Sequence, residues 1–343
     1  MKSTVAVALS GGADSAVAAH VLLSAGHRVL GIHYVLNNDS HAQTQRERAE
    51  AVARHLGVIL DVREATGLFE SLVITPSREE YRAGRTPNPC VVCNRTVKFG
   101  ALLDHAIGMG ADQMATGHYA RIGLRDGRST LMRAVDGHAD QSYFLYSIEP
   151  HALECVLFPL GSMQRREVSS IAAREGLVAG KSSQDICFDV FPGTEERSGN
   201  VVDLDGHIVG RHRGLSSFTI GQRRGLGIAT GSPLYVVRVD AEHNEVVVGS
   251  EKDLVCRAAT IRDVRWLAGH PPSSGQEVQA RVRYRTKSTP ARVLSEDLAT
   301  IVVFDEPQRA VAPGQSVVIY DGEEVLGGGI VNVTHQRSPF ENE

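Results

Sequence analysis

The sequence lacks the long hydrophobic runs and the charge excess that mark several classes of protein. No stretch reaches the roughly 20 apolar residues that a membrane-spanning helix requires, and the apolar run beginning at Thr4 is too short for a secretory signal peptide. The 343 residues carry a formal net charge of −4, which excludes a uniformly basic, RNA-binding coat. With 42% hydrophobic residues the chain can bury cores. We therefore expect a cytoplasmic globular protein of two or three domains that binds no membrane.

Cysteine is also scarce. The five cysteines are too few, and too odd in number, for a secreted disulfide scaffold. Cys155 and Cys256 stand in apolar segments and are expected to be core residues. Cys90 and Cys93 could form half of a zinc site, but no second Cys-x-x-Cys or His-x₃-His completes it. A thioredoxin-type pair would leave the nucleotide loop described below unexplained.

The first half of the chain alternates predicted strands and helices, which indicates βαβ units and a doubly wound parallel sheet. Strands are predicted at Val5–Leu9, Arg28–Val35, Val58–Val62 and Gln113–Thr116, and helices at Ser15–Ala25, Gln43–Leu56, Asn94–Met109 and Gln164–Glu175. After Phe191, glycine-punctuated short runs predict small antiparallel strands. From Cys256, longer β-branched runs predict a β-barrel. The expected fold is α/β, with domains at residues 1–192, 193–256 and 257–343.

A glycine-rich loop, Ser10-Gly-Gly-Ala-Asp-Ser15, separates the first strand from the first helix. Adjacent glycines let backbone N–H groups turn toward an anion, and the helix N-terminus adds partial positive charge. The loop contains neither Gly-Lys-Ser/Thr nor Gly-x-Gly-x-x-Gly, so it is no kinase-type P-loop or dinucleotide fingerprint. A bare helix cap would need only one of these polar residues. We therefore predict a phosphate site, with Asp14 placed to hold Mg²⁺.

Two cysteine-bearing segments carry further chemistry. The run Thr86-Pro-Asn-Pro-Cys-Val-Val-Cys-Asn94 places Cys90 and Cys93 on a predicted proline-stiffened loop before a helix that begins near Asn94. A helix N-terminus favours the thiolate, which is the nucleophilic form of cysteine. Further on, Cys187 stands alone on a predicted polar turn.

Together these segments resemble the tRNA-specific 2-thiouridylase family of the PP-loop ATP pyrophosphatase superfamily. Seven motifs match in order: Ser10–Ser15, Thr86–Asn94, Ala115–Arg121, Asp140–Leu145, Ser183–Phe188, Thr219–Leu226 and Ala312–Gln315. The resemblance implies that ATP adenylates O2 of the wobble uridine of tRNA and that sulfur then replaces this oxygen. It implies a persulfide on Cys187, and Cys93 as the nucleophile that resolves it as a disulfide.

The resemblance also implies the binding residues. Those expected to contact ATP are Ala8, Leu9, Ser10, Gly11, Gly12, Ala13, Asp14, Ser15, Tyr34 and Gly117. Those expected to contact tRNA are Asn88, Pro89, Cys90, His118, Ala139, Asp140, Gln141, Arg283, Tyr284, Arg285 and Gln315. The implied partners are tRNAs for Glu, Gln and Lys, and a cysteine desulfurase or sulfur-relay protein as sulfur donor.

Two positions depart from the family pattern. Many members carry an aspartate, a proposed general acid or base, where this chain has Cys90. Cys90, Cys93 and Cys187 could instead hold a [4Fe–4S] cluster with one iron open to hydrosulfide. At Ala139 a basic residue is common, so one phosphate contact is expected to be missing.

Arginines mark a predicted RNA-facing surface. Between Arg257 and Arg292 there are eight basic residues and two acidic ones, and the alternating Arg281, Arg283 and Arg285 are predicted to share one strand face. Arg78, Arg82 and Arg85 are expected in a mobile loop. The nucleotide loop is also compatible with two other functions. One is a PP-loop ligase acting on a small metabolite, which would need neither Cys187 nor a basic barrel. The other is an RNA-binding module with an inactive nucleotide site.

Overall fold

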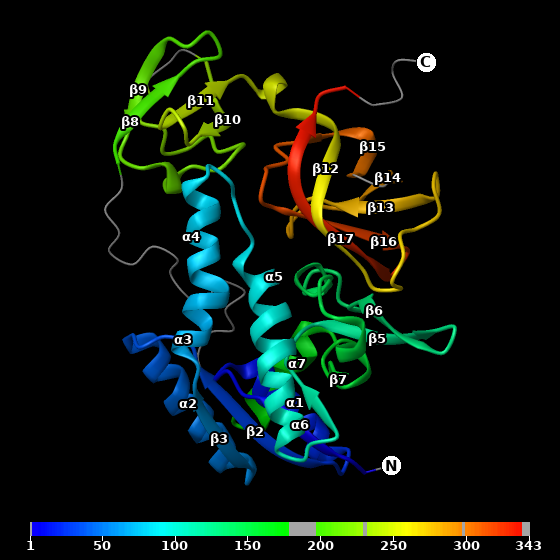
Figure 1. The fold of residues 1–343 in the computed structure, drawn as a ribbon. Helices are drawn as coiled ribbons and strands as arrows, with labels where there is room; N and C mark the ends of the chain where they lie inside the picture. The colour runs from blue at the N-terminus through cyan, green and yellow to red at the C-terminus, as the bar shows by residue number, and fades with distance from the viewer. Residues whose placement is uncertain (1, 178–196, 229–231, 297–298, 338–343) are drawn as a thin grey trace.

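The computed structural model describes residues 2–177, 197–228, 232–296 and 299–337. Its N-terminal part is built on a parallel sheet with the strand order β3-β2-β1-β4-β7 (Figure 1). These strands are β1 (Thr4–Ala8), β2 (Arg28–Val35), β3 (Ile59–Glu64), β4 (Gln113–Ala115) and β7 (Val156–Leu157). The α/β class and the parallel sheet predicted from the alternating pattern are therefore confirmed.

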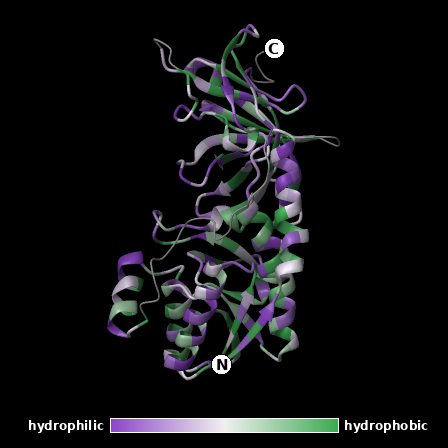
Figure 2. Cartoon of the chain, turned by 90° about the vertical axis from the view of Figure 1, so that its left-hand side faces the viewer, coloured by the Kyte–Doolittle hydropathy of each residue, from purple (hydrophilic) through white to green (hydrophobic). Residues whose placement is uncertain are grey.

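Helices cover both faces of this sheet because alternate side chains of a strand point to opposite sides. Val5 and Val7 pack with the apolar faces of α1 (Ala13–Ser24), α2 (Ser40–Leu56) and α7 (Arg165–Arg174). Ala6, between them, belongs to a second cluster on the other face. Figure 2 shows the same segregation, with hydrophobic strands inside and hydrophilic stretches on the outer helices of the elongated chain.

One continuous helix contains the first cysteine pair. It consists of α5 (Pro89–Cys93), a π-helical stretch η2 (Asn94–Leu102) and α6 (Leu103–Gly108). The prediction that the cysteines lie on a loop before the helix is therefore wrong. Pro89 occupies the first helical turn, where its missing N–H costs nothing.

Part of the segment predicted as a mobile loop is also helical, which corrects that expectation for Arg78 and Arg82, while Arg85 follows the helix in a stretch without helix or strand. Helix α3 (Thr66–Phe69), π-helical η1 (Glu70–Ile74) and α4 (Thr75–Arg82) follow one another directly. Arg78 bonds Glu70 at 2.6 Å within this helix. Short 3₁₀ turns elsewhere are η3 (Ser142–Phe144), η4 (Pro150–Glu154), η5 (Leu215–Ser217) and η6 (Glu251–Leu254).

The middle part is a small sheet with the order β10-β11-β8-β9. Its strands are β8 (Gly199–Val202), β9 (Ile208–His212), β10 (Tyr235–Asp240) and β11 (Glu245–Gly249). β8 and β11 run parallel, whereas the sequence predicted antiparallel strands throughout. The hairpin neighbours are antiparallel, as expected from their short connections.

The C-terminal part is a closed barrel, as predicted. Its strands are β12 (Val255–Trp266), β13 (Glu277–Arg281), β14 (Thr289–Glu296), β15 (Ala299–Arg309), β16 (Ser316–Asp321) and β17 (Glu324–His335). Pairing of β12 with β17 closes the ring. Cys256 is buried in this barrel, and burial raises its pKa to about 12, which confirms it as a core residue. Cys155, by contrast, is only partly buried.

A hairpin from the N-terminal part joins the barrel's sheet. It comprises β5 (Ala120–Arg125) and β6 (Arg128–Arg133), and Met132 of β6 pairs with Glu324 of β17. Arg121 and Arg125 bond Glu323 and Glu324 across this seam, at 2.7 and 2.6 Å. The sequence reading did not predict the hairpin, which anchors the barrel to the N-terminal sheet (Figure 1). Among the described residues, no helix is long and apolar enough to cross a membrane.

Glu80 forms a second contact between the N-terminal part and the barrel. Its carboxylate accepts two bonds from Arg85, at 2.7 and 2.8 Å, and one from Arg262 of β12 at 2.8 Å. The hydrogen bonds from Arg85, with the charge of Arg262, lower the pKa of Glu80. A lowered carboxyl pKa stabilises the folded state above its unfolded value of 4.5, and this stabilisation is lost as the pH falls through the folded pKa.

We therefore expect Glu80→Gln to destabilise the protein at pH 7 by about 1–2 kcal/mol, because two arginines lose a half-buried partner. The difference from wild type should shrink as the pH falls through the lowered pKa of folded Glu80 and vanish below it, where Glu80 is protonated in both states. Calorimetric unfolding across this pH range measures it. Glu50→Gln removes the exposed i,i+4 pair with Arg46 and serves as the control, with a smaller change expected. Equal effects of the two variants would contradict the junction role of Glu80.

Candidate active site

A cavity of about 240 Å³ opens at the carboxyl ends of β1, β2 and β4. This edge of a parallel sheet is where open α/β folds bind ligands. Nine of the residues predicted to contact ATP or tRNA line it, together with others such as His33 of β2 and Lys98. The nine are Ala8, Leu9, Ser10, Asp14, Ser15, Tyr34, Gly117, His118 and Gln141.

The Ser10–Ser15 loop is held open by its own hydroxyl bonds and by one glycine. Gly11 has a φ of +77°, and a Cβ there would collide with the Gln45 carbonyl oxygen. The Ser15 hydroxyl donates to the Gly12 carbonyl at 3.0 Å and accepts from the Ser10 N–H at 3.2 Å. The Ser15 hydroxyl therefore holds the shape of the loop.

Gly117 lies directly against this loop. A Cβ at Gly117 would come within 2.7 Å of the Ser15 nitrogen and 2.8 Å of the Asp14 carbonyl carbon. The chain after β4 thus packs backbone to backbone on the first turn of α1. This contact explains why glycine is needed here, although the position has no positive φ.

Aromatic and cationic side chains form the remaining walls. Tyr34 leaves the end of β2, and its hydroxyl donates to the Ala101 carbonyl at 3.4 Å. Burial lowers the pKa of His118, with the charge of Lys98 adding to the effect. A ring nitrogen of His118 lies 2.7 Å from the Thr116 hydroxyl. The imidazole is therefore neutral at neutral pH.

Cys93 lies one layer behind the cavity. It is 4% exposed and packs in an apolar cluster with Phe69, Val73 and Val97, and Val97 itself lines the cavity. Cys90, one helical turn earlier, is partly exposed. Cys187, the predicted persulfide carrier, lies outside the described residues, so two of the three thiols proposed for a cluster can be placed. They stand three residues apart on one helix, a spacing compatible with ligation of one group.

Several predicted tRNA residues meet where the helix start contacts the barrel. Tyr143 donates its hydroxyl to the Ser316 carbonyl at 2.9 Å, and Phe144 packs on Tyr284 with ring centroids 4.4 Å apart. Tyr284 Oη and Gln315 Oε1 are buried there without a hydrogen-bond partner among the described residues. Thr86, two residues before Asn88, bonds the Pro313 carbonyl at 2.8 Å. The structure thus brings the segment Asn88–Cys90 together with Tyr284 and Gln315.

The arginines predicted to share a strand face do not do so, which is a correction. β13 ends at Arg281, which is 9% exposed and pairs with Asp140 at 3.2 Å. Arg283 donates to the Ile220 carbonyl at 2.9 Å, and Arg285 is exposed in the following turn. The Arg281 guanidinium donates to the backbone carbonyls of Tyr284 and Thr286 in that turn.

Ala139 and Asp140 are buried, with exposures of 0% and 2%. The Asp140 carboxylate also accepts the N–H groups of Ala134 and Ser142, at 3.1 and 3.2 Å. The tRNA contacts predicted at these two positions stay predictions.

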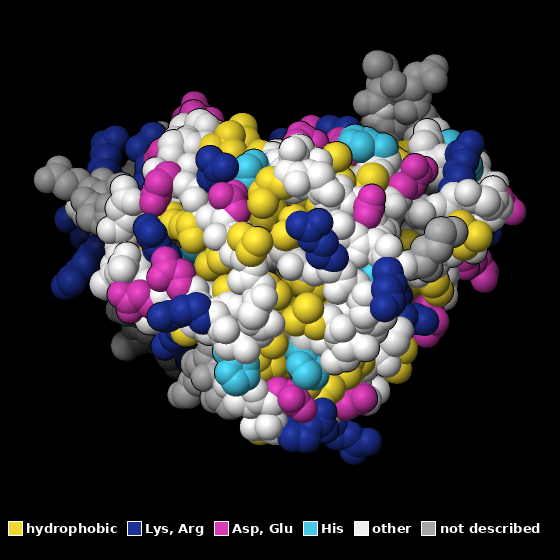
Figure 3. Space-filling view, turned by 90° about the horizontal axis from the view of Figure 1, so that it is seen from below, with side chains coloured by type: hydrophobic (Ala, Val, Ile, Leu, Met, Phe, Trp, Pro, Cys, Tyr) yellow, Lys and Arg dark blue, Asp and Glu magenta, His cyan; other side chains and the backbone are white. Residues whose placement is uncertain are grey.

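Several cations in the basic run of the barrel pair with acids, most of which lie outside the run. Arg265 pairs with Glu149 at 3.4 Å, and Arg292 with Glu277 and Asp305, both at 3.7 Å. The exposed cations left in these segments are Arg285, Lys287, Arg211, Arg213, Arg223 and Arg224. On the face seen from below, basic and acidic side chains are intermixed (Figure 3), so the basic surface is not on that face.

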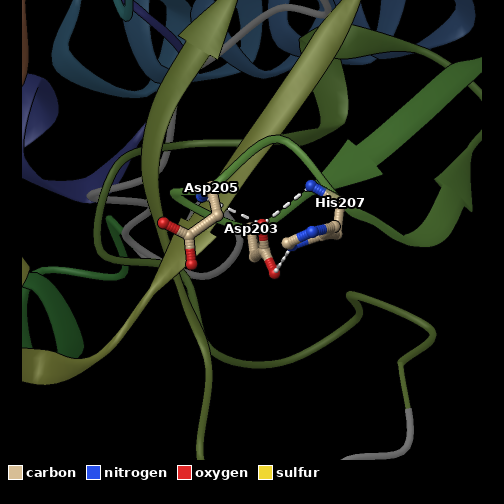
Figure 4. A group of neighbouring side chains, drawn as sticks. All are labelled: Asp203, Asp205 and His207. Carbon is tan, nitrogen blue, oxygen red and sulfur yellow. Dashed lines mark hydrogen bonds and ion pairs between the residues drawn. The ribbon is translucent and has the colours of Figure 1, made fainter.

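A group of possible metal ligands stands apart from the cavity. Asp203, Asp205 and His207 lie in the turn between β8 and β9 (Figure 4). Asp203 accepts the N–H groups of Asp205 and His207, at 3.0 and 2.8 Å, so these contacts build the turn.

The sequence did not predict two residues that line the cavity, His33 and Lys98, or one that lies behind its wall, Tyr119. His33 bonds the Leu9 carbonyl at 2.7 Å, and Tyr119 bonds Asp14, which lines the cavity, at 3.1 Å. Of these residues, only His33 gave a signal in the sequence, because a histidine stands there two residues before the end of a strand that leads to the site.

Comparison with known proteins finds relatives over nearly the whole chain. Family models described as tRNA methyl transferase HUP domain, tRNA methyl transferase PRC-barrel domain and Aminomethyltransferase beta-barrel domain match residues 3–190, 193–250 and 256–331. The tRNA-specific 2-thiouridylase MnmA of Acetivibrio thermocellus is 42% identical, covering 96% of this chain and 99% of that protein. The tRNA-specific 2-thiouridylase MnmA of Syntrophotalea carbinolica is 44% identical, covering 94% and 97%.

Among solved structures, the chain is similar to the U34-tRNA thiolase NcsA from Methanococcus maripaludis, described with its [4Fe-4S] cluster. The match covers 52% of this chain and 58% of that one, at 20% identity and a TM-score of 0.36. A likeness this weak carries no argument about the cluster.

Proposed function

Since the chain belongs to the tRNA-specific 2-thiouridylase family, we propose how its own residues divide the reaction. The enzyme is an ATP-dependent tRNA sulfurtransferase that replaces the C2 oxygen of a uridine by sulfur. One observation carries the residue assignment: the helix 89–108 contains Cys93 near its start and contributes Val97 and Lys98 to the wall of the nucleotide cavity. A single rigid element therefore links the sulfur chemistry to ATP.

The first step is adenylation. The uracil O2 attacks the α-phosphorus, the bond to the β-phosphate oxygen breaks, and pyrophosphate leaves. The Ser10–Ser15 loop at the start of α1 binds the phosphates, and Asp14 holds the Mg²⁺ that accompanies ATP. Lys98 stabilises the charge that develops on the phosphate oxygens. Tyr34 flanks the adenine, and Gly117 lets the backbone approach the nucleotide.

The second step is sulfur transfer. The terminal sulfur of a Cys187 persulfide attacks C2, the bond from C2 to the adenylated oxygen breaks, and AMP leaves. The Cys93 thiolate then attacks the inner sulfur, which forms the Cys93–Cys187 disulfide and releases 2-thiouridine. An external thiol must reduce this disulfide before the next turnover. The sulfur donor is a cysteine desulfurase or a sulfur-relay protein.

A second route would use a [4Fe–4S] cluster on Cys90, Cys93 and Cys187. It is favoured by one observation, the presence of a thiol at position 90 on the same helix as Cys93. When bound, such a cluster would supply an iron that carries hydrosulfide.

The wobble uridine of tRNAs for Glu, Gln and Lys is the proposed target. A stacked base must be splayed out to reach the cavity. The junction formed by Asn88–Cys90, Tyr284 and Gln315 is the proposed entry, because two buried polar atoms there lack a partner among the described residues. The exposed Arg285 would contact the phosphate backbone beside it.

Incubation with ATP, a cysteine desulfurase and tRNA tests the assignment. We expect 2-thiouridine in the nucleoside mass spectrum, with one pyrophosphate released per thiolation. Asp14→Ala should lower pyrophosphate release about a hundredfold, because the phosphate charge loses its metal-binding partner. Asp205→Ala, an exposed carboxylate outside the cavity, is the matched control. Unchanged pyrophosphate release by Asp14→Ala would remove this residue from the metal role.

A further inference from the structure

Tyr119 is a buried side chain whose only polar atom meets the nucleotide loop. It is 1% exposed, and its ring packs in the apolar cluster shared by α1 and α7. Its hydroxyl donates to Asp14 Oδ1 at 3.1 Å. A carboxylate rotates freely about its last torsion unless a bond holds it, so this contact sets the plane of the Asp14 carboxylate.

The backbone of Tyr119 is held by Gln141. The Tyr119 N–H donates to Gln141 Oε1 at 3.0 Å, and the Gln141 N–H donates to the Tyr119 carbonyl at 2.8 Å. Gln141 also lines the cavity and is one of the predicted tRNA contacts. Two residues before Tyr119, Gly117 rests on the backbone of Asp14 and Ser15. The segment 117–119 is therefore clamped between Gln141 and the nucleotide loop.

We propose that Tyr119 is a positioning residue that orients Asp14 toward the cation of the ATP complex, and that the chain Gln141–Tyr119–Asp14 couples tRNA binding to ATP binding. This inference rests on the proposed function, since it takes Asp14 as the cation ligand and Gln141 as a tRNA contact. Any such coupling is reciprocal: tRNA must change ATP affinity by the same factor as ATP changes tRNA affinity.

The donor in this chain stays protonated. Burial, followed by the nearby Asp14 carboxylate, raises the pKa of Tyr119 far above neutrality. The Tyr119 hydroxyl is the donor in this bond, and the Asp14 carboxylate is the acceptor. A hydrogen bond to a charged acceptor is among the stronger ones in proteins.

Tyr119→Phe tests the positioning role because it keeps the ring and removes only the donor. Calorimetric titration without tRNA should show about tenfold weaker ATP binding and a higher Mg²⁺ concentration at half-saturation. The ratio of ATP affinities with and without tRNA should fall toward one. Gln141→Leu, which removes the acceptor of the Tyr119 N–H, should lower the same ratio while leaving the Tyr119 hydroxyl in place.

Tyr320→Phe is the matched control. Tyr320 is fully buried, and its hydroxyl lies 3.4 Å from the Ser142 hydroxyl, away from the cavity. This variant should bind ATP with wild-type affinity and Mg²⁺ dependence. Wild-type ATP affinity and Mg²⁺ dependence in Tyr119→Phe would overturn the proposal. These titrations need no sulfur transfer, so a failure of thiolation in the wild-type protein would count against the proposed function alone.

Discussion

Cys93→Ser is expected to lower tRNA thiolation about a thousandfold or more, with ATP binding and tRNA binding unchanged. Serine keeps the size of the side chain but cannot break the persulfide S–S bond, so the step that releases 2-thiouridine stops. Cys93 packs behind the cavity wall among Val73 and Val97, so the substitution leaves the nucleotide surface intact. Single-turnover thiolation, read by mass spectrometry of tRNA nucleosides, measures the loss. Pyrophosphate release should continue.

Cys90→Ser separates the two sulfur routes. In the persulfide route only Cys93 and Cys187 react, so this variant should retain thiolation within about threefold, whereas Cys187→Ser should eliminate it while tRNA binding persists. In the cluster route, removal of any of the three thiols should cost activity alike and lower the iron content of protein prepared without oxygen. Loss of thiolation in Cys90→Ser together with loss of iron would therefore contradict the persulfide route.

Cys256→Ser is the matched control for a buried thiol. Cys256 lies in the barrel core, where its thiol bonds the backbone, with the Ala258 carbonyl at 3.5 Å. We expect reduced stability and full thiolation per folded molecule, because its raised pKa keeps the thiol protonated and unreactive. Retained thiolation by Cys187→Ser would contradict the persulfide mechanism, whatever the activities of the Cys90 and Cys93 variants.

Gly117→Ala is expected to weaken ATP binding by about ten- to a hundredfold. The added Cβ would stand 2.7 Å from the Ser15 nitrogen and 2.8 Å from the Asp14 carbonyl carbon, and both are backbone atoms that cannot rotate away. The loop or the segment after β4 must move, and such overpacking costs roughly 1–3 kcal/mol. Because the atoms that the Cβ would meet belong to the nucleotide loop, the displacement should change the loop that binds the phosphates. Calorimetric titration with ATP measures the change in affinity.

Gly108→Ala provides the matched control, because a Cβ at the end of α6 meets nothing within 4 Å. This variant should bind ATP as the wild type does. Binding of tRNA should be unaffected in Gly108→Ala, since Gly108 lies neither at the junction with the barrel nor in the segment 117–119. Wild-type ATP affinity in Gly117→Ala would show that the segment 117–119 yields without disturbing the loop.

The local signals of the sequence were strongest where short-range physics decides. Short apolar runs predicted β1 and β2. Gly57, with a φ of +67°, ends α2 where the sequence predicted the end of that helix. The Gly-Gly pair after the first strand predicted the phosphate loop, and the structure shows that Gly11 is the member that needs to be glycine. These features depend on neighbouring residues, so one stretch of sequence contains them.

Signals that depend on distant partners misled the prediction. The basic run of the barrel was counted as free charge because its neutralising acids come from elsewhere, such as Glu80 and Glu149. Arg281, predicted to face RNA, is buried against Asp140. Whether an arginine faces solvent depends on which acid the fold brings beside it, and spacing along one strand does not show this.

The sequence by itself determined the parallel sheet, the phosphate loop at its carboxyl edge, the barrel and the family with its reaction. Only the tertiary structure decided that a π-helical stretch carries Lys98 into the cavity, that Tyr119 reaches Asp14, and that a hairpin joins the barrel's sheet. The physical reason is the distance along the chain over which each interaction acts. Periodicity and turn chemistry act over a few residues, whereas helix winding, buried hydrogen bonds and strand pairing between distant segments are settled by what packs against them.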